Sequence, residues 1–432
     1  MTERTDERRS GGRERPSGWR GRLGCTAAVL VPLALVVGIA WVFLRPMGYW
    51  PGSSMMTAWV ARSDGAEAAP EDATDRTWVA GDLVVRGGPD GVRAFHAGSG
   101  AQRWEYTPPR LTDLCALSAT ADDSVVLIAY TGRDGGCATV AALDLRDGRE
   151  LWHAAHVPAL DALGDRGLST GRGLPGVGGA LAVADGLGIV LEAGGDHGPA
   201  LRALELRTGA PRWTAAVPKG CLPGPSATAP KLVLTVLDCG DEMKLAAFEP
   251  TDGAERWTVP LDARRGVTAG TDVTVVAAEP IVLRVDDGDV LVFGPDGRPG
   301  PRIKPASPPS RLYGADVAVS DGRLFALTGG GRWGLLVGYD LSSGDESWRA
   351  EVGGAAYTLG GLHAGAGRVM VLRTSARAGD LLHTFDAATG DEEERVFRDL
   401  VTSVRELIPY RELLIAVHPA SSGRPFSAYE RW

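Results

Sequence analysis

The sequence predicts an all-β fold built from one repeated unit. A short phrase recurs along the 432-residue chain: a small or apolar pair, an acidic or polar position, a Gly, and a Trp four residues after that Gly. Runs rich in Val, Leu and Ala lie between the copies and are bounded by turn residues, which is typical of strands. A recurrence at about forty to sixty residues indicates one supersecondary unit copied around or along an axis.

Five copies of the phrase are complete. They pair Gly100 with Trp104, Gly148 with Trp152, Gly209 with Trp213, Gly253 with Trp257, and Gly344 with Trp348. Degenerate copies follow the same period at Gly297, at Gly390, and at Ala428–Glu430, where the sequence ends. Eight copies therefore predict eight repeats of one unit.

Each copy has the form of an antiparallel hairpin. An alternating apolar run enters a polar turn, such as Arg146-Asp147-Gly148, and leaves on a second run that carries the Trp. The Gly can adopt the positive φ that such turns require. Two more β-rich runs lie upstream, so four strands per repeat are expected. We expect each Trp to wedge between neighbouring sheets, where its burial contributes about 2 to 3 kcal/mol.

The phrase resembles the tryptophan-docking motif of quinoprotein-like, or PQQ-like, β-propellers, over roughly residues 57–432. The resemblance implies an eight-bladed β-propeller of four-stranded antiparallel blades. The last copy has no room for an outer strand, and Thr57–Ala61 resembles the Trp-bearing outer strands. We therefore expect an N-terminal strand to complete the last blade, because closure removes exposed sheet edges.

A long apolar stretch precedes the repeats. Residues 23–44 carry no charge and would span about 33 Å as a helix, enough to cross a bilayer. Seven Arg precede this stretch, which places the N-terminus in the cytoplasm and the propeller outside. The predicted organisation is a cytoplasmic tail (1–22), a transmembrane helix (23–44), a linker (45–56) and a propeller (57–432) in the cell membrane. A cleaved signal peptide is the alternative.

Four cysteines fall as two pairs within single repeats. We expect disulfides between Cys115 and Cys137 and between Cys221 and Cys239, since an even set in an oxidising compartment favours disulfide formation. Cys221 and Cys239 lie nearly symmetrically about residues 230–231, where a hairpin turn is expected. Metal ligation is the alternative, but no Cys-x-x-Cys or His-Cys spacing supports it.

Charge excludes some partners. The formal net charge is −9, and the basic N-terminal segment contributes none of the acidic excess. An acidic propeller should repel nucleic acid and anionic lipid head groups at long range. The expected partner is an envelope protein or an extracellular ligand, with membrane contact through the N-terminal helix.

No catalytic, cofactor-binding or metal-binding residue is predicted. The quinoprotein enzymes that the repeat resembles hold pyrroloquinoline quinone (PQQ) beneath a disulfide between adjacent cysteines, with calcium and an aspartate base, and this sequence has no adjacent cysteines. Asp286–Asp289 is interpreted as a turn more readily than as a calcium site. His153 and His156 would point to opposite faces of a strand. Gly329–Gly331 is interpreted as a hairpin.

Three functions remain open from the sequence. The first is a membrane-anchored, non-catalytic propeller that acts as a scaffold for a protein or ligand. The second is a PQQ-dependent oxidoreductase, and the third is an extracytoplasmic sensor that works with a separate signalling partner. Rim loops usually carry recognition on such scaffolds, so residues 157–178 and the Pro-rich stretch 299–309 are the first candidates for a binding surface.

Overall fold

The structure is a computed structural model that describes residues 36, 38–39, 54–62, 75–131, 137–155, 179–192, 198–229, 231–262, 266–286, 288–308, 312–330, 333–353, 357–374, 380–397, 401, 403–419 and 422–431. The predicted tail, nearly all of the apolar stretch 23–44 and most of the linker lie outside these residues. Among the described residues, no helix is long and apolar enough to cross a membrane.

The described strands form six separate four-stranded sheets and one nine-stranded sheet. The first three four-stranded sheets are β2 (Arg76–Ala80), β3 (Leu83–Gly88), β4 (Gly91–His96) and β5 (Gln102–Tyr106); β6 (Leu114–Leu117), β7 (Val125–Tyr130), β8 (Thr139–Asp144) and β9 (Arg149–Ala155); and β10 (Leu181–Ala184), β11 (Leu187–Glu192), β12 (Ala200–Glu205) and β13 (Pro211–Ala216). A 3-10 turn, η1 (Pro109–Leu111), lies between β5 and β6.

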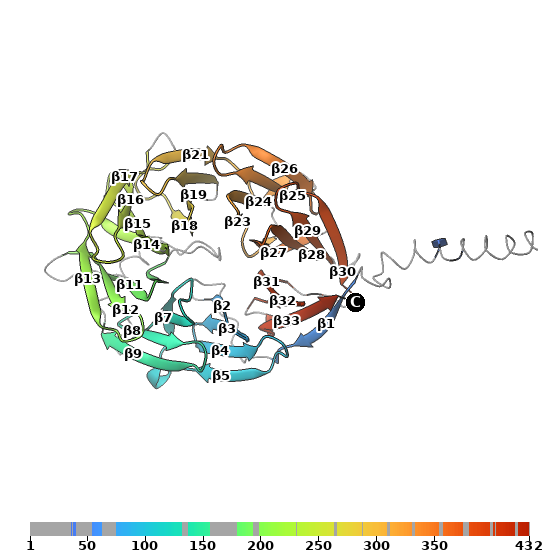
Figure 1. Cartoon of the computed structure of the whole chain (residues 1–432), viewed down its shortest axis with the longest axis horizontal. Helices are drawn as coiled ribbons and strands as arrows, with labels where there is room; N and C mark the ends of the chain where they lie inside the picture. Colours follow the sequence, from blue (N-terminus) through green and yellow to red (C-terminus); the bar gives the residue numbers. More distant parts are fainter. Residues whose placement is uncertain are drawn as a thin grey trace, which may run out of the picture.

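The next three sheets continue the pattern. They are β14 (Leu222–Ala229), β15 (Leu232–Asp238), β16 (Met243–Phe248) and β17 (Glu255–Pro260); β18 (Val273–Ala278), β19 (Ile281–Val285), β20 (Asp289–Phe293) and β21 (Pro299–Ile303); and β23 (Val317–Ser320), β24 (Arg323–Gly330), β25 (Trp333–Asp340) and β26 (Glu346–Glu351). Each sheet is a meander in which consecutive strands pair. Figure 1 shows the sheets around a central axis, with first strands innermost and fourth strands at the perimeter.

The nine-stranded sheet contains the remaining strands. They are β22 (Leu312–Tyr313), β27 (Thr358–Gly365), β28 (Arg368–Thr374), β29 (Leu381–Asp386), β30 (Glu392–Phe397), β1 (Ser54–Val60), β33 (Phe426–Arg431), β32 (Leu413–Val417) and β31 (Glu406–Tyr410), in that spatial order. Strands β27 to β30 form one antiparallel run, and β31 to β33 with β1 form another. A short parallel pairing of β1 with β30 joins the two runs.

The hydrophobic core lies between neighbouring sheets. Middle strands such as β7, with the sequence VVLIAY, are buried along their whole length because both of their faces meet another sheet. Outer strands such as β5 alternate between exposed and half-buried positions, since one of their faces meets solvent. One cluster joins Val85 and Ala94 of the first sheet to Ile128 and Leu143 of the second. The stack is therefore held by apolar contacts from sheet to sheet.

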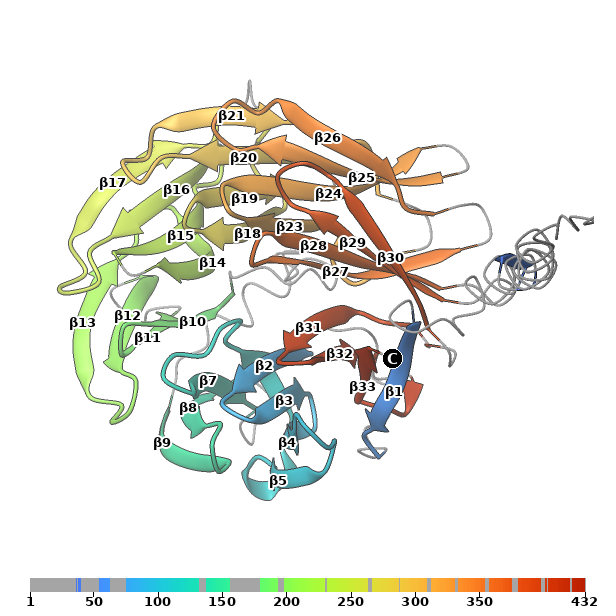
Figure 2. The same cartoon turned by 45° about the vertical axis from the view of Figure 1, so that its right-hand side comes forward.

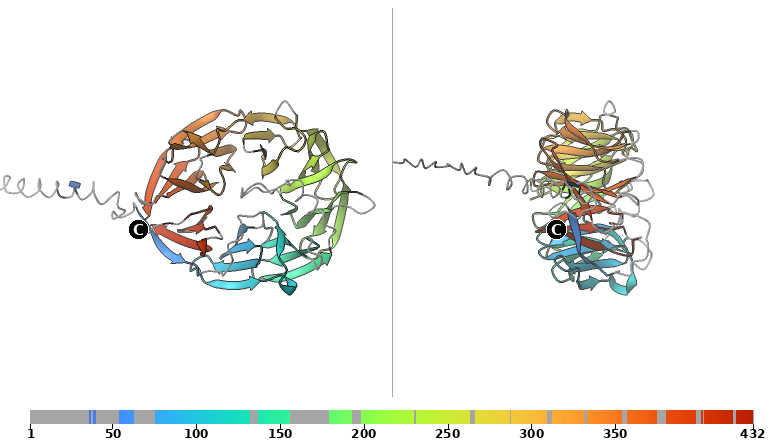
Figure 3. Two further views of the ribbon diagram at one scale, coloured as in Figure 1. Left: turned by 180° about the vertical axis from the view of Figure 1, so that it is seen from behind. Right: turned by 90° about the vertical axis from the view of Figure 1, so that its right-hand side faces the viewer.

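The predicted N-terminal closing strand is confirmed. β1 pairs antiparallel with the C-terminal strand β33, so that Thr57 lies opposite Tyr429 and Trp59 opposite Ala428. Figure 2 shows β1 beside β33, and the edge-on view in Figure 3 shows the sheets gathered into a disc. The strand begins at Ser54, inside the predicted linker. The two ends of the repeat region thus share one sheet.

Candidate functional site

The predicted Gly and Trp residues meet between sheets rather than within one hairpin. Each turn Gly has a positive φ, from +67° at Gly100 to +81° at Gly344. A Cβ atom built on Gly148 would lie 2.5 Å from Cε3 of Trp104, which belongs to the preceding sheet. The same relation links Gly100 to Trp59, Gly209 to Trp152, Gly253 to Trp213, Gly297 to Trp257, and Gly390 to Trp348.

Several of the indole rings also donate a hydrogen bond across the junction. Nε1 of Trp152, Trp213, Trp257 and Trp348 donates to a backbone carbonyl of the next turn, at 2.9, 2.7, 3.0 and 3.1 Å. Nε1 of Trp59 and Nε1 of Trp104 are buried without a partner among the described residues. The indole thus packs against the turn of the next sheet and, at these four positions, also hydrogen-bonds to it.

Two of these contacts between a turn Gly and a ring of the preceding sheet involve a residue that lies outside the five complete Gly–Trp copies. Trp59 lies on β1, far from any turn Gly of its own, yet it packs on Gly100 of the first sheet. Gly344 meets Pro301 on β21, which occupies the position that holds Trp in other outer strands. An apolar ring of another kind can therefore fill the same space.

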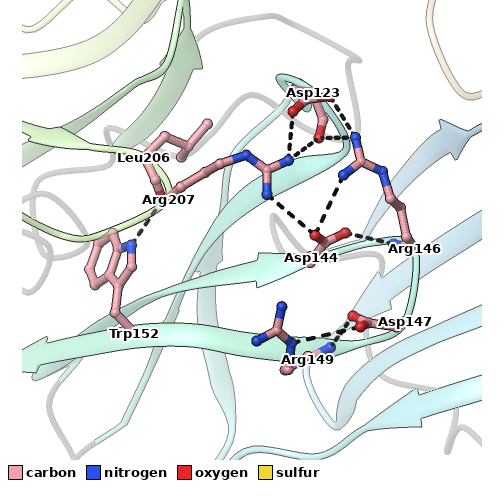
Figure 4. A network of polar contacts seen from close by, with 8 residues as sticks. All are labelled: Asp123, Asp144, Arg146, Asp147, Arg149, Trp152, Leu206 and Arg207. Atoms are coloured by element: carbon pink, nitrogen blue, oxygen red, sulfur yellow. Dashed lines mark hydrogen bonds and ion pairs between the residues drawn. The ribbon is translucent and has the colours of Figure 1, made fainter.

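The turns on one rim are tied together by charge. Figure 4 shows Asp123 between the guanidinium groups of Arg146 and Arg207, at 2.5 and 2.6 Å. Arg207 belongs to the next sheet and also reaches Asp144, at 3.5 Å. The hydrogen bond from Arg207 and the charge of Arg146 lower the pKa of Asp123. These ion pairs are solvent-exposed, so each contributes little, but together they fix neighbouring turns in register.

A second charged cluster joins the first and last sheets near the central axis, beside the innermost strands β2 and β31 (Figure 1). The Asp75 carboxylate accepts from Arg86 of its own sheet at 3.3 Å and pairs with Arg405, next to β31, at 2.5 Å. Arg405 also donates to the Asp75 carbonyl at 2.8 Å. Burial raises the pKa of Glu406, at the start of β31, to about 7. The cluster therefore holds a carboxyl group that exchanges its proton near neutral pH.

Both predicted disulfides are present. Cys221 pairs with Cys239, and the strands between them turn where expected, with Ala229 opposite Leu232. Cys115 of β6 pairs with Cys137, just before β8, with a Cα–Cα distance of 5.9 Å. Each bond joins strands of a single sheet.

The weaker sequence candidates are dispersed. Val285 lies opposite Asp289 in the register of β19 and β20, so Asp286 lies in a turn, and Asp289 pairs with Arg302; Asp287 is outside the described residues. His153 is exposed and lies 2.6 Å from Glu150, whereas His156 is not described. Gly329 and Gly330 end β24, where Gly330 lies opposite Trp333 of β25, and Gly331 is outside the described residues.

The two surface candidates have different outcomes. Residues 157–178 lie outside the described residues. The interpretation of 299–309 as a rim loop was wrong for its first five residues, because Pro299–Ile303 form β21, the outer strand of a sheet. Prolines are tolerated there since an outer strand needs hydrogen bonds on one side only.

One cluster of potential metal ligands was not predicted. Among the described residues, His383, Glu392 and Glu394 bring one ligand atom each within 4.8 Å of one another. A His on one strand and a Glu-x-Glu on the next is the sequence signal, but it is informative only when the strand register is known.

The residues present do not fit the quinone pocket of the PQQ enzymes at one point. The enzymes that the repeat resembles hold the quinone beneath a disulfide between adjacent cysteines, whereas the disulfides here join cysteines 22 and 18 residues apart within their sheets. We derive no chemical step through such a cofactor.

Comparisons with known proteins agree with the fold described above. The family model described as outer membrane protein assembly factor BamB matches residues 92–298, slightly less than half of the chain. No curated protein is significantly similar to this chain in sequence.

Solved structures of similar fold are quinoprotein enzymes. Quinohemoprotein alcohol dehydrogenase ADHIIG from Pseudomonas putida HK5 superposes with a TM-score of 0.54 at 12% identity, covering 88% of this chain and 77% of that one. A europium-containing methanol dehydrogenase gives 0.53 at 13% identity, covering 87% and 93%. Quinohemoprotein alcohol dehydrogenase from Comamonas testosteroni gives 0.51 at 14% identity, covering 87% and 76%. The repeat, the sheets and these likenesses identify the fold of this chain as a PQQ-like β-propeller.

Proposed function

We propose that this chain is a non-catalytic, eight-bladed propeller scaffold that binds an envelope protein from outside the cytoplasmic membrane, to which residues 23–44 anchor it. The count of eight treats the two antiparallel runs of the nine-stranded sheet as separate blades. The match of residues 92–298 to an assembly-factor family is the observation that carries the proposal. Indole wedges and disulfides support it, since they make a rigid platform.

The two rims of the ring differ in a way that favours one of them for binding. The turns between first and second strands and those between third and fourth strands share a rim, here called the turn rim. Backbone hydrogen bonds tie these turns together, as from Leu145 to Ser124 and from Leu206 to Gly186. The opposite rim, here called the connection rim, carries the sheet-to-sheet connections and the Cys221–Cys239 disulfide. Connections on a rigid body are the usual place for recognition.

Site-specific photo-crosslinking tests the scaffold function and the rim together. A photoreactive residue is placed at Lys219 or Asp241 on the connection rim, and at Thr208 or Asp252 on the turn rim, all four positions being exposed. In native membranes we expect one discrete protein adduct from the first two positions and none from the controls. Adducts from the turn rim alone would refute the choice of rim, and no discrete adduct from any position would refute the scaffold.

A PQQ-dependent oxidoreductase is the second candidate, because the solved structures of similar fold are dehydrogenases of this type. The test is reconstitution of the full chain with PQQ and calcium, followed by dye-linked assays with alcohols and sugars. Turnover above that of the cofactor alone would replace the scaffold with this function.

A further inference from the structure

The outer strand β30 departs from the pattern of the other outer strands. In the earlier sheets, the pairing of the third and fourth strands has a register shift beside the Trp position, which Pro301 occupies in β21. Phe95 lies opposite Gln102 and Ala94 opposite Trp104, so Gln102 and Trp104 point to opposite faces. The pairing of β29 with β30 has no such shift: Phe385 lies opposite Glu392 and His383 opposite Glu394.

This regular register turns two carboxylates to one face. Glu394 is four residues after Gly390 and so occupies the position that carries Trp in other copies. Without the bulge it shares a face with Glu392, two residues away, and with His383 across the strand pair. Glu393 points to the other face and pairs with Arg395.

The absence of a Trp at this position has a structural reason. The next run of strands has β1 as its outer member, and β1 enters from the other end of the sequence. Its pairing with β33 therefore has no hairpin turn or turn Gly to receive an indole, and β1 pairs directly with β30 at Ser54 and Met55. The docking position on β30 is thus released for another use.

The three side chains are arranged as ligands. His383 is 1% exposed, and its Nδ1 contacts Glu392 and lies 3.5 Å from Oε1 of Glu394. Its Nε2 is buried without a hydrogen-bond partner among the described residues, so the ring meets polar groups through Nδ1. The imidazole is also held parallel to the Phe385 ring, at 6.2 Å between centroids. Packing therefore fixes the direction in which Nδ1 of His383 points, toward the two glutamates.

We propose that His383, Glu392 and Glu394 form a binding site for a divalent transition-metal ion of the zinc class. Ligand atoms about 3.3 Å apart surround a tetrahedral ion with bonds of about 2.0 Å, close to the separation of His383 and Glu394. Glu392 must withdraw from Nδ1 to admit the ion, and its partly exposed side chain has room to do so. One imidazole and two carboxylates leave a coordination position for water. The exposure of Glu394, 53%, provides the path of entry.

Zinc titration of the full chain, freed of metal and of any affinity tag, tests the proposal. We expect one equivalent of Zn²⁺ to bind, and Co²⁺ to give visible d–d absorption when it replaces zinc. Glu394→Gln is nearly isosteric and exposed, so it should fold, and it should weaken zinc binding at least about 10-fold, as disturbance of a metal site typically does. His383→Gln should abolish the cobalt spectrum.

His153→Gln is the matched control. His153 also contacts a glutamate, at 2.6 Å, but it is exposed and has one such neighbour. It should leave the affinity and the spectrum unchanged. The site is refuted if no equivalent binds, if Glu394→Gln binds zinc as tightly as the parent, if His383→Gln retains the cobalt spectrum, or if the control loses as much affinity as Glu394→Gln. The outcome is independent of which partner or reaction the propeller serves.

Discussion

Substitution of Gly148 by Ala tests why a glycine stands in this turn. A glycine can adopt the positive φ of the turn, and it leaves space for the Trp104 ring. The residue has a φ of +73°, and an added Cβ would lie 2.5 Å from the Trp104 ring. Gly322 provides a matched control, since its φ is +71° and a Cβ there would meet nothing within 4 Å. Both Ala variants incur the cost of a left-handed backbone, but Gly148→Ala must also displace an indole.

The magnitudes follow from these two terms. The backbone term is about 1 to 2 kcal/mol for a residue with a Cβ. Forcing a packed ring aside adds about 1 to 3 kcal/mol. We expect Gly322→Ala to lower the free energy of unfolding by about 1 kcal/mol and Gly148→Ala by about 3 kcal/mol.

Urea denaturation followed by far-ultraviolet circular dichroism measures both variants, provided that the slopes agree. Introducing Gly148→Ala into a Trp104→Ala background should reduce its cost to that of Gly322→Ala, because the space is then empty. Equal losses for the two glycine variants in the parent protein would show that the turn selects glycine for its backbone alone. The sheet-to-sheet role of the indole would then be refuted.

Three further predictions concern closure and the blade interior. Glu406→Gln should stabilise the protein by up to about 3 kcal/mol at pH 8 and have little effect near pH 4.5. The folded-state pKa of about 7 exceeds the ordinary glutamate value of 4.5, so the stability that the carboxyl contributes is full below pH 4.5 and lost as pH rises through 7. Identical unfolding curves for variant and parent at both pH values would contradict this. Replacing Cys221 and Cys239 together by Ala should lower the free energy of unfolding by about 3 kcal/mol relative to the oxidised parent in urea denaturation, whereas variant and parent should unfold alike under reducing conditions, where both disulfides are broken. Deleting residues 54–60 should lower the melting temperature sharply in calorimetry, whereas a truncated protein as stable as the parent would contradict closure through β1.

Much of the architecture could be predicted from the sequence because its signals are local. The strand runs, the positive-φ glycines and the turn at residues 230–231 depend on neighbours in the chain. The Cys221–Cys239 pair followed from the same local symmetry. The position of the closing strand also followed, since the last copy lacked an outer strand and Thr57–Ala61 supplied the missing pattern.

What could not be predicted depends on contacts between distant parts of the chain. Periodicity pairs Gly148 with Trp152, but it contains no information that Gly148 packs on Trp104 of the preceding sheet. The ion pair of Asp75 with Arg405 joins residues 330 positions apart. The face of Glu394 depends on whether a bulge precedes it, which is a property of strand pairing and not of composition.

Strand β1 makes more contacts with neighbouring sheets than the other outer strands do, because it closes the ring. Its backbone completes the sheet of β33, its first residues pair with β30, and its Trp59 packs on Gly100 of the first sheet. One strand therefore contacts three successive runs of strands, while an ordinary outer strand serves its own sheet and the next one. At the inner end, Asp75 and Arg405 join the same first and last sheets, and Phe95 and Phe426 meet edge to face between them, at 5.5 Å. The junction between the ends of the repeat region is thus fixed at its perimeter, middle and axis, which makes it a continuous interface rather than a seam.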